Sequence, residues 1–242
     1  MSRRSAPLIL GHRGARRRAV ENTLEAFELA AREGADGVEL DVRLDGSGNV
    51  IVLHDPTLAR VTDGTDSRAV EQLSSRELSQ VRLPGGERIP GLEPILDWAA
   101  GAGVMVNVEL KPDVSRRERL VRQVAGILRC GSLPPHRVLL SSLHPGILTR
   151  LARFAEGYAL GWIIAPELER FWREPLWPGL PGVAAHPDRS LVTAARVAAV
   201  HRRHARLNVW TVNEPNQAIE LARLGVDAII TDDPAALVGA LR

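Results

Sequence analysis

The chain has 242 residues, a length that fits one α/β domain of about 250 residues better than two small domains, so residues 1–242 are treated as one domain. The net charge is +2 and no block of five like charges appears, so we do not expect nucleic acid as a partner. No stretch approaches 18 uninterrupted apolar residues, so we do not expect stable membrane insertion. The single Cys130 excludes an internal disulfide, and we expect a soluble, cytoplasmic protein.

Short apolar runs alternate with amphipathic segments along the chain. The runs typical of strands are Leu8–Gly11, Gly37–Val42, Val50–Leu53, Val104–Leu110, Arg137–Ser141, Tyr158–Ile163, Gly182–Ala185, Leu207–Val212 and Ala228–Thr231. Helices are predicted over Thr23–Glu33, about 115–130, 145–155, 191–204, Pro215–Leu224 and 234–241. This alternation indicates parallel strands covered by helices.

The third strand-like run does not belong to the parallel set. Only seven residues, 43–49, separate Val42 from Val50, whereas a parallel crossover needs about a dozen. The run therefore predicts a hairpin with the second strand, and a turn near Ser47 places His54 opposite Leu40 or Asp41. Eight parallel strands remain, which predicts a (β/α)8 TIM barrel.

Two segments interrupt the regular alternation. Residues 55–96 form a small insertion after the second-strand hairpin, with one weak helix near Ser74–Gln80. Residues 164–181 carry Phe171, Trp172 and Trp177 between prolines. These aromatic residues form either a helix that packs on the barrel or an apolar lip over its mouth.

Three carboxylates stand at the carboxyl ends of predicted strands, where barrels of this kind carry their functional groups. Glu39 and Asp41 are two residues apart and share one side of a strand, and Glu109 ends the next barrel strand. Any one of them alone is typical of a salt bridge. Three together predict a site for a hard divalent cation, Mg²⁺ or Ca²⁺, with Mn²⁺ as a third option.

Histidines and cations accompany these carboxylates at the strand ends. His12 and His54 form a natural acid–base pair, and Arg13 can grip a phosphoryl group with two hydrogen bonds. Lys111 is the only lysine beside 30 arginines, which singles it out as a second cation for an anionic substrate. An enolase-like or aldolase-like barrel that acts on carboxylic acids, with Lys111 as its base or its Schiff-base amine, is the competing interpretation.

Six short motifs in this order resemble the glycerophosphodiester phosphodiesterase family, over about residues 8–234. They are His12-Arg13-Gly14, Glu21-Asn22-Thr23, Glu39-Leu40-Asp41-Val42, His54-Asp55, Glu109-Leu110-Lys111 and Trp210-Thr211-Val212-Asn213. The resemblance implies hydrolysis of a glycerophosphodiester, a deacylated phospholipid, to glycerol 3-phosphate and an alcohol.

The resemblance also implies residue roles. It gives the metal to Glu39, Asp41 and Glu109, acid–base catalysis to His12 and His54, and substrate binding to Arg13, Lys111 and Trp210. His186 either contacts the ligand or caps its strand. The chain departs from the family pattern at Val20, Gly91 and Leu143, where the family has proline, threonine and phenylalanine.

Two other functions remain open at this point. A lysophospholipase D-type enzyme would cleave lysophospholipids with the same barrel and metal, and a non-catalytic barrel would only bind phosphodiesters. The small-molecule substrate is the partner that we expect, and the sequence is also compatible with a homodimer.

Overall fold

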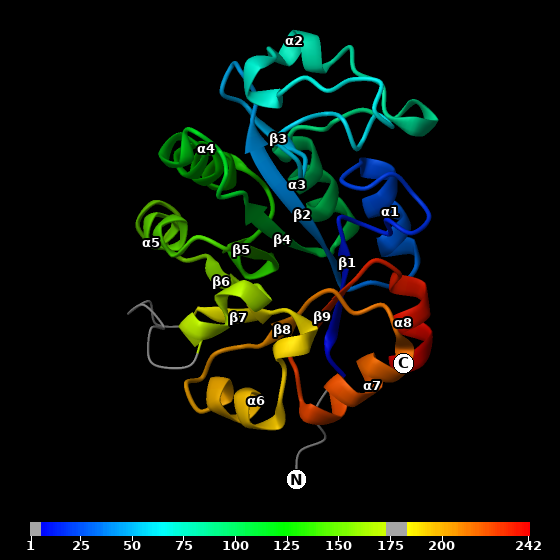
Figure 1. The fold of residues 1–242 in the computed structure, drawn as a ribbon, viewed down its shortest axis with the longest axis vertical. Coiled ribbons are helices and arrows are strands. Elements are labelled where there is room, and N and C mark those ends of the chain that lie inside the picture. Colours follow the sequence, from blue (N-terminus) through cyan, green and yellow to red (C-terminus); the bar gives the residue numbers. More distant parts are fainter. Residues whose placement is uncertain (1–5, 173–182) are drawn as a thin grey trace.

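The computed structural model describes residues 6–172 and 183–242, in which eight parallel strands form a barrel surrounded by helices (Figure 1). The sheet order is β7-β6-β5-β4-β2-β1-β9-β8, and bridges between Ala185 and Leu207 and between Asp188 and Trp210 join β7 to β8. The predicted (β/α)8 TIM barrel is confirmed. Its strands are β1 (Leu8–His12), β2 (Gly37–Leu44), β4 (Met105–Leu110), β5 (Val138–Ser142), β6 (Ala159–Ile164), β7 (Ala184–Pro187), β8 (Asn208–Val209) and β9 (Ala228–Thr231).

Local sequence signals mark some of the helix ends. Thr23 accepts a hydrogen bond from the Ala26 amide at the start of one helix, and Gly225, at φ 88°, ends another. The helices are α1 (Leu24–Arg32), α2 (Ser75–Leu78), α3 (Leu92–Ala102), α4 (Arg117–Cys130), α5 (Pro145–Phe154), α6 (Ala194–His201), α7 (Pro215–Leu224) and α8 (Pro234–Leu241).

Strand β3 (Val50–Val52) pairs antiparallel with β2 and stands outside the ring of parallel strands. Val42 pairs with Val52 and Leu44 with Val50, so the turn centres on Ser47. The Leu53 amide donates to the carbonyl oxygen of Asp41 at 2.9 Å, which continues the register and places His54 opposite Leu40. The hairpin prediction is confirmed, and it brings His54 to the carboxyl end of the barrel.

Alternation along β2 separates the hydrophobic core from the candidate site. Leu40 and Val42 belong to the core between the strands and the helices, and both are fully buried. Glu39 and Asp41 occupy the positions in between and therefore face the barrel axis. The same alternation on β4 turns Val108 and Leu110 to the core and leaves Glu109 on the axial side.

The insertion after β3 has a hydrophobic cluster of its own, in which Leu53, Leu58 and Val70 are buried. Its helix α2 begins with a capping box between Ser74 and Glu77. In Figure 1 this segment lies beyond the end of β2, next to β3. Helix α3 begins at Leu92, so the predicted boundary of the insertion at residue 96 falls inside a barrel helix.

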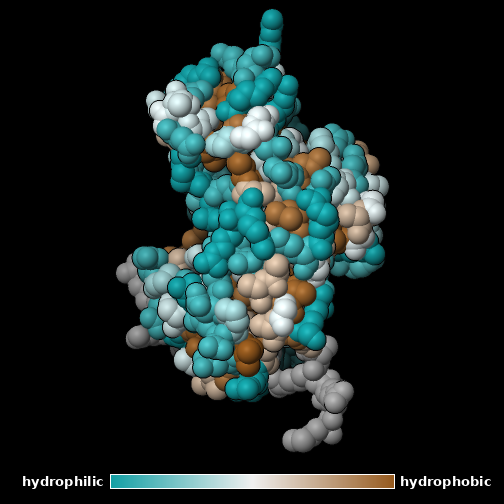
Figure 2. Space-filling model, turned by 90° about the vertical axis from the view of Figure 1, so that its right-hand side faces the viewer, coloured by the Kyte–Doolittle hydropathy of each residue, from teal (hydrophilic) through white to brown (hydrophobic). Residues whose placement is uncertain are grey.

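The segment predicted to carry the aromatic lip is only partly described. A 3-10 helix spans Pro166–Trp172, while Trp177 and the predicted strand start at Gly182 lie outside the described residues. Figure 2 shows a face of the molecule on which hydrophilic side chains dominate and apolar ones form small scattered patches. Among the described residues, no helix has the length and apolar character needed to cross a membrane.

Candidate active site

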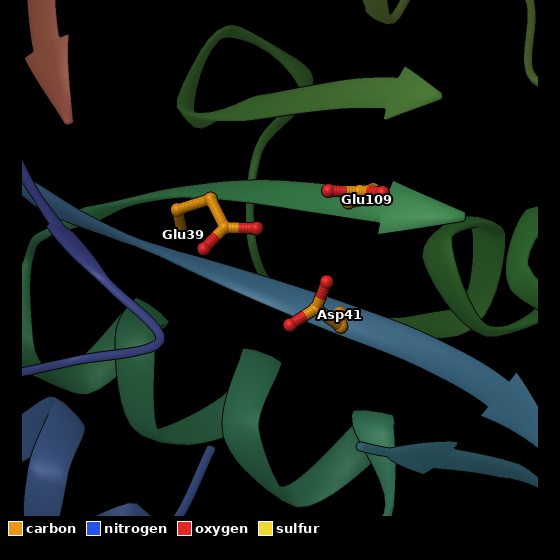
Figure 3. Close-up of side chains that lie close together, drawn as sticks. All are labelled: Glu39, Asp41 and Glu109. Atoms are coloured by element: carbon orange, nitrogen blue, oxygen red, sulfur yellow. The ribbon is translucent and has the colours of Figure 1, made fainter. Parts of the chain in front are cut away.

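Three carboxylates converge at the carboxyl end of the barrel. Glu39 and Asp41 extend from β2 and Glu109 from β4, and one oxygen of each lies within 4.8 Å of the others (Figure 3). Glu39 and Asp41 are almost fully buried. Oxygen ligands at this spacing fit a hard divalent cation, which would balance charges that otherwise repel one another.

The electrostatics show which carboxylates lack sufficient positive charge. Burial and the charges of Asp41 and Glu109 raise the pKa of Glu39 well above its usual value. Burial also raises the pKa of Glu109, although the nearby charge of Lys111 opposes it. Burial acts in the same direction on Asp41, but the charges of Lys111 and Arg13 outweigh it and lower the pKa of that carboxyl. Glu39 therefore has the strongest need for a further cation.

Lys111 and Arg13 place two positive charges beside these carboxylates. The ammonium of Lys111 lies 2.9 Å from Glu109 and 3.3 Å from Asp41. The guanidinium Nε of Arg13 lies 3.2 Å from Asp41, without the geometry of a hydrogen bond, and the Arg13 amide donates to Glu39 at 3.0 Å. Arg13 adopts φ 54°, in the left-handed region that residues other than glycine rarely occupy.

His12 and Asp232 form one histidine–carboxylate pair at the pocket. Nδ1 of His12 lies 2.6 Å from Asp232, while Nε2 points to Glu39 at 4.0 Å. Asn213 donates to the other oxygen of Asp232 at 2.8 Å and fixes its orientation. Burial lowers the pKa of His12 and the bond to Asp232 only partly opposes it, so this imidazole is neutral near pH 7.

His54 and Asp55 form a second pair of the same kind. Nδ1 of His54 lies 2.5 Å from Asp55, which also accepts from Arg60 at 2.5 Å. Burial lowers the pKa of His54, against the charge of Asp41. In both pairs the carboxylate engages Nδ1, which leaves Nε2 to exchange a proton with a ligand.

His186 and Trp210 contribute another wall. His186 is fully buried, with Nε2 2.9 Å from the side-chain amide of Asn208 and with Nδ1 unpartnered among the described residues. The indole nitrogen of Trp210 donates to the carbonyl oxygen of His186 at 2.7 Å. A Cβ atom at Gly161 would lie 2.4 Å from the His186 ring, so a larger residue there would displace this wall.

One pocket of about 120 Å³ brings almost all of the predicted site residues together. Eight of the nine line it, and Asp41 reaches it through contacts with Lys111 and Arg13. Asp232, which pairs with His12, and Arg60, which binds Asp55, were not among the predicted site residues. The lining residues are His12, Arg13, Glu39, His54, Asn107, Glu109, Lys111, Leu143, Ile163, His186, Trp210 and Ile230.

The family model for the glycerophosphoryl diester phosphodiesterase family matches residues 12–236, which include all of these groups. The chain belongs to this family. As a glycerophosphodiester phosphodiesterase family member, it is a phosphoric diester hydrolase, and the resemblance drawn from the six motifs is confirmed.

Relatives of known name cover nearly the whole chain. A glycerophosphodiester phosphodiesterase of Caldanaerobacter subterraneus is 28% identical over 97% of this chain and 98% of its own length. A probable glycerophosphodiester phosphodiesterase 1 of Mycobacterium tuberculosis is 42% identical over 94% of this chain and 90% of its own.

Solved structures agree with the fold of this family member. A phosphodiesterase of Oleispira antarctica, in complex with the product sn-glycerol-3-phosphate, gives a TM-score of 0.84 at 26% identity over 97% of this chain and 96% of that one. A putative glycerophosphoryl diester phosphodiesterase of Silicibacter pomeroyi gives 0.86 at 27% identity over 98% and 93%.

Proposed function

We propose that the protein hydrolyses glycerophosphodiesters to glycerol 3-phosphate and an alcohol, with a divalent cation and two histidines. The observation that carries this proposal is the convergence of three carboxylates, two histidine–aspartate pairs and two cations on one pocket. The sn-glycerol-3-phosphate bound as product in the Oleispira antarctica phosphodiesterase supports the same choice of product.

Arg13 and Lys111 bind the phosphodiester group in this proposal. Both side chains line the pocket and carry full positive charge beside carboxylates. A phosphodiester carries one negative charge, so the two cations orient it and stabilise the additional charge of the transition state. Trp210 and His186 enclose the part of the substrate that lies farther from the phosphate.

Glu39, Asp41 and Glu109 hold one Mg²⁺ or Ca²⁺ ion. When bound, the ion supplies Lewis-acid stabilisation of the phosphoryl oxygens. The raised pKa of Glu39 and of Glu109 supports this assignment, because both carboxyls lack a sufficient positive counter-charge in the protein alone.

His12 and His54 transfer the protons. Each presents Nε2 while an aspartate engages Nδ1, so a neutral ring accepts a proton at Nε2 and its aspartate stabilises the resulting cation. We assign His54 as the base that activates the nucleophile and His12 as the acid that protonates the leaving alcohol. The nucleophile is the 2-hydroxyl of the substrate, which gives a cyclic phosphate that water then opens.

A single assay tests the reaction class. Release of glycerol 3-phosphate from a panel of glycerophosphodiesters, and of lysophosphatidic acid from lysophospholipids, is measured in EDTA and again after Mg²⁺, Ca²⁺ or Mn²⁺ is restored. We expect metal-dependent release from the deacylated substrates. Release that is unaffected by EDTA contradicts the metal, cleavage of lysophospholipids alone contradicts the substrate, and a lack of turnover on every substrate contradicts the proposal.

A further inference from the structure

An unbroken series of ion pairs, with a histidine–carboxylate hydrogen bond at each end, joins the two candidate catalytic histidines around the pocket. We call it the ion-pair belt. On the His12 side, His12 lies 2.6 Å from Asp232, and Arg16 lies 3.4 Å from Asp232 and 3.7 Å from Glu21. On the His54 side, Arg60 lies 2.8 Å from Glu21 and 2.5 Å from Asp55, and Asp55 lies 2.5 Å from His54. In order, the belt consists of His12, Asp232, Arg16, Glu21, Arg60, Asp55 and His54.

We propose that Glu21 and Arg60 are positioning residues, which use the ion-pair belt to hold His12 and His54 in one geometry across the pocket. The inference rests on the proposed acid–base roles of the two histidines. Neither Glu21 nor Arg60 lines the pocket among the described residues, so each acts through its neighbours.

The two histidines need such a connection because they come from different parts of the fold. His12 ends β1, inside the ring of parallel strands, whereas His54 follows β3, which lies outside that ring. The segment after His54 has its own hydrophobic cluster, separate from the barrel core. Glu21 lies in the β1–α1 connection and Arg60 lies in the insertion. Their contact therefore connects the residues that support His12 to those that support His54.

Glu21 is suited to the centre of the belt. Its carboxylate accepts from Arg60 at 2.8 and 2.9 Å and from Arg13 at 2.9 Å, and it faces Arg16 at 3.7 Å. Burial acts to raise its pKa, but the hydrogen bonds from Arg60 and the charge of Arg13 outweigh this and lower it. The carboxylate is therefore ionised and lies among three guanidinium groups.

Arg60 uses the geometry that distinguishes arginine from lysine. Its Nε donates to Asp55 while both terminal nitrogens donate to Glu21, so one rigid plane spans two carboxylates. Lysine offers a point charge that cannot make this set of bonds at fixed angles. The Arg60 side chain is 44% exposed, so its ion pairs contribute little to the free energy of unfolding. We therefore assign it to the orientation of Asp55 and Glu21.

The test compares Arg60→Met with Arg68→Met in turnover of glycerophosphoethanolamine with saturating metal. Arg68 is a matched control, because it lies in the same insertion, is 52% exposed and pairs with Asp66 outside the belt. We expect Arg60→Met to lower kcat about tenfold with KM changed less than about threefold, as typical losses of supporting residues suggest. Arg60→Lys should recover only part of kcat, and Arg68→Met should match the wild type.

A double-mutant cycle tests whether the belt acts as one unit. Asp232→Asn weakens the support of His12, and Arg60→Met weakens that of His54, with Arg16 and Glu21 between the two sites. We expect the double variant to lose less than the product of the two single losses, because one broken link already releases the belt. Strictly multiplicative losses, or a folded Arg60→Met with wild-type kcat, would overturn the proposal.

The two proposals fail in different ways. Loss of activity in His12→Ala and His54→Ala, together with wild-type kcat in Arg60→Met, contradicts the belt and leaves the proposed reaction intact. A wild-type protein that releases no glycerol 3-phosphate contradicts the reaction itself. Unfolding temperatures of each variant separate a positioning defect from a loss of fold.

Discussion

The guanidinium Nε of Arg43 donates to the carbonyl oxygen of His54 at 2.7 Å. The same side chain holds Asp113 through Nη2 at 2.6 and 2.7 Å, which connects the end of the hairpin to the loop after β4. The Arg43 side chain is 2% exposed and the Asp113 side chain is 50% exposed. Water can therefore solvate Asp113 without its partner, but it cannot solvate Arg43.

This inequality gives the first prediction. Asp113→Ala leaves a buried guanidinium without its counter-charge and should lower the free energy of unfolding by about 3 kcal/mol. Arg43→Met leaves a carboxylate that water can solvate, plus one unpaired carbonyl, and should cost about 1–2 kcal/mol. Urea unfolding at pH 7 measures both, and the reverse ranking would contradict the assignment of Arg43 as the desolvated partner.

Removal of one carboxylate should abolish metal binding. A ligand that binds only the folded protein raises its stability, by about 2.7 kcal/mol at one hundred times its Kd. We expect Mg²⁺ or Ca²⁺ to raise the unfolding temperature of the wild type but not of Glu39→Ala, whose kcat falls at least about 100-fold. Glu118→Ala, an exposed acidic control on α4, should keep both properties. A metal-induced rise retained by Glu39→Ala would contradict its role as a ligand.

Loss of the proposed base should separate chemistry from metal binding. His54→Ala should lower kcat by about 10²- to 10⁴-fold, because the proton acceptor at the pocket is gone. The unfolding temperature should still rise with divalent cation, since Glu39, Asp41 and Glu109 remain. Turnover at the wild-type rate would show that His54 transfers no proton.

His186 should make stability depend on pH. Burial lowers its pKa to about 3, from 6.5 in an unperturbed imidazole. Between these values the unfolded chain binds a proton that the folded protein does not, so stability falls as the pH drops below about 6.5. The loss attributable to His186 is about 2 kcal/mol between pH 7.5 and pH 5. Urea unfolding at both pH values should show a smaller difference for His186→Gln, and an equal difference would contradict a buried neutral imidazole.

Local pattern was sufficient to predict the barrel and most of the residues that line the candidate site. Alternation on β2 put Glu39 and Asp41 on one side, and the short connection before Val50 predicted the turn at Ser47. Helix α3 was not predicted, although Leu92, Ile95, Leu96 and Ala99 recur at helical spacing and are all buried in it. Strand β8 is shorter than the predicted Leu207–Val212, because Leu207 and Trp210 take part in isolated bridges to β7 and lie outside the ladder with β9.

The supporting contacts of the histidines could not be predicted in the same way. Asp232 is 220 residues from His12 and meets it only because β9 pairs with β1. Arg60 is 39 residues from Glu21 and reaches it across two irregular segments. Such contacts depend on barrel closure and on the position of the insertion, neither of which has a periodic signal in the sequence.

The barrel has a seam. Each of the other neighbouring strand pairs forms a ladder, while β7 and β8 meet through two isolated bridges, at Ala185 and at Asp188. His186 and Trp210, which form one wall of the pocket, lie at this seam and are joined across it by the indole hydrogen bond. Because this joint lacks a continuous ladder, it should open at a lower free energy than the ladders of β2 and β4, and its amide hydrogens should exchange with solvent before theirs. Transient widening of the barrel would then begin beside the substrate and not behind it.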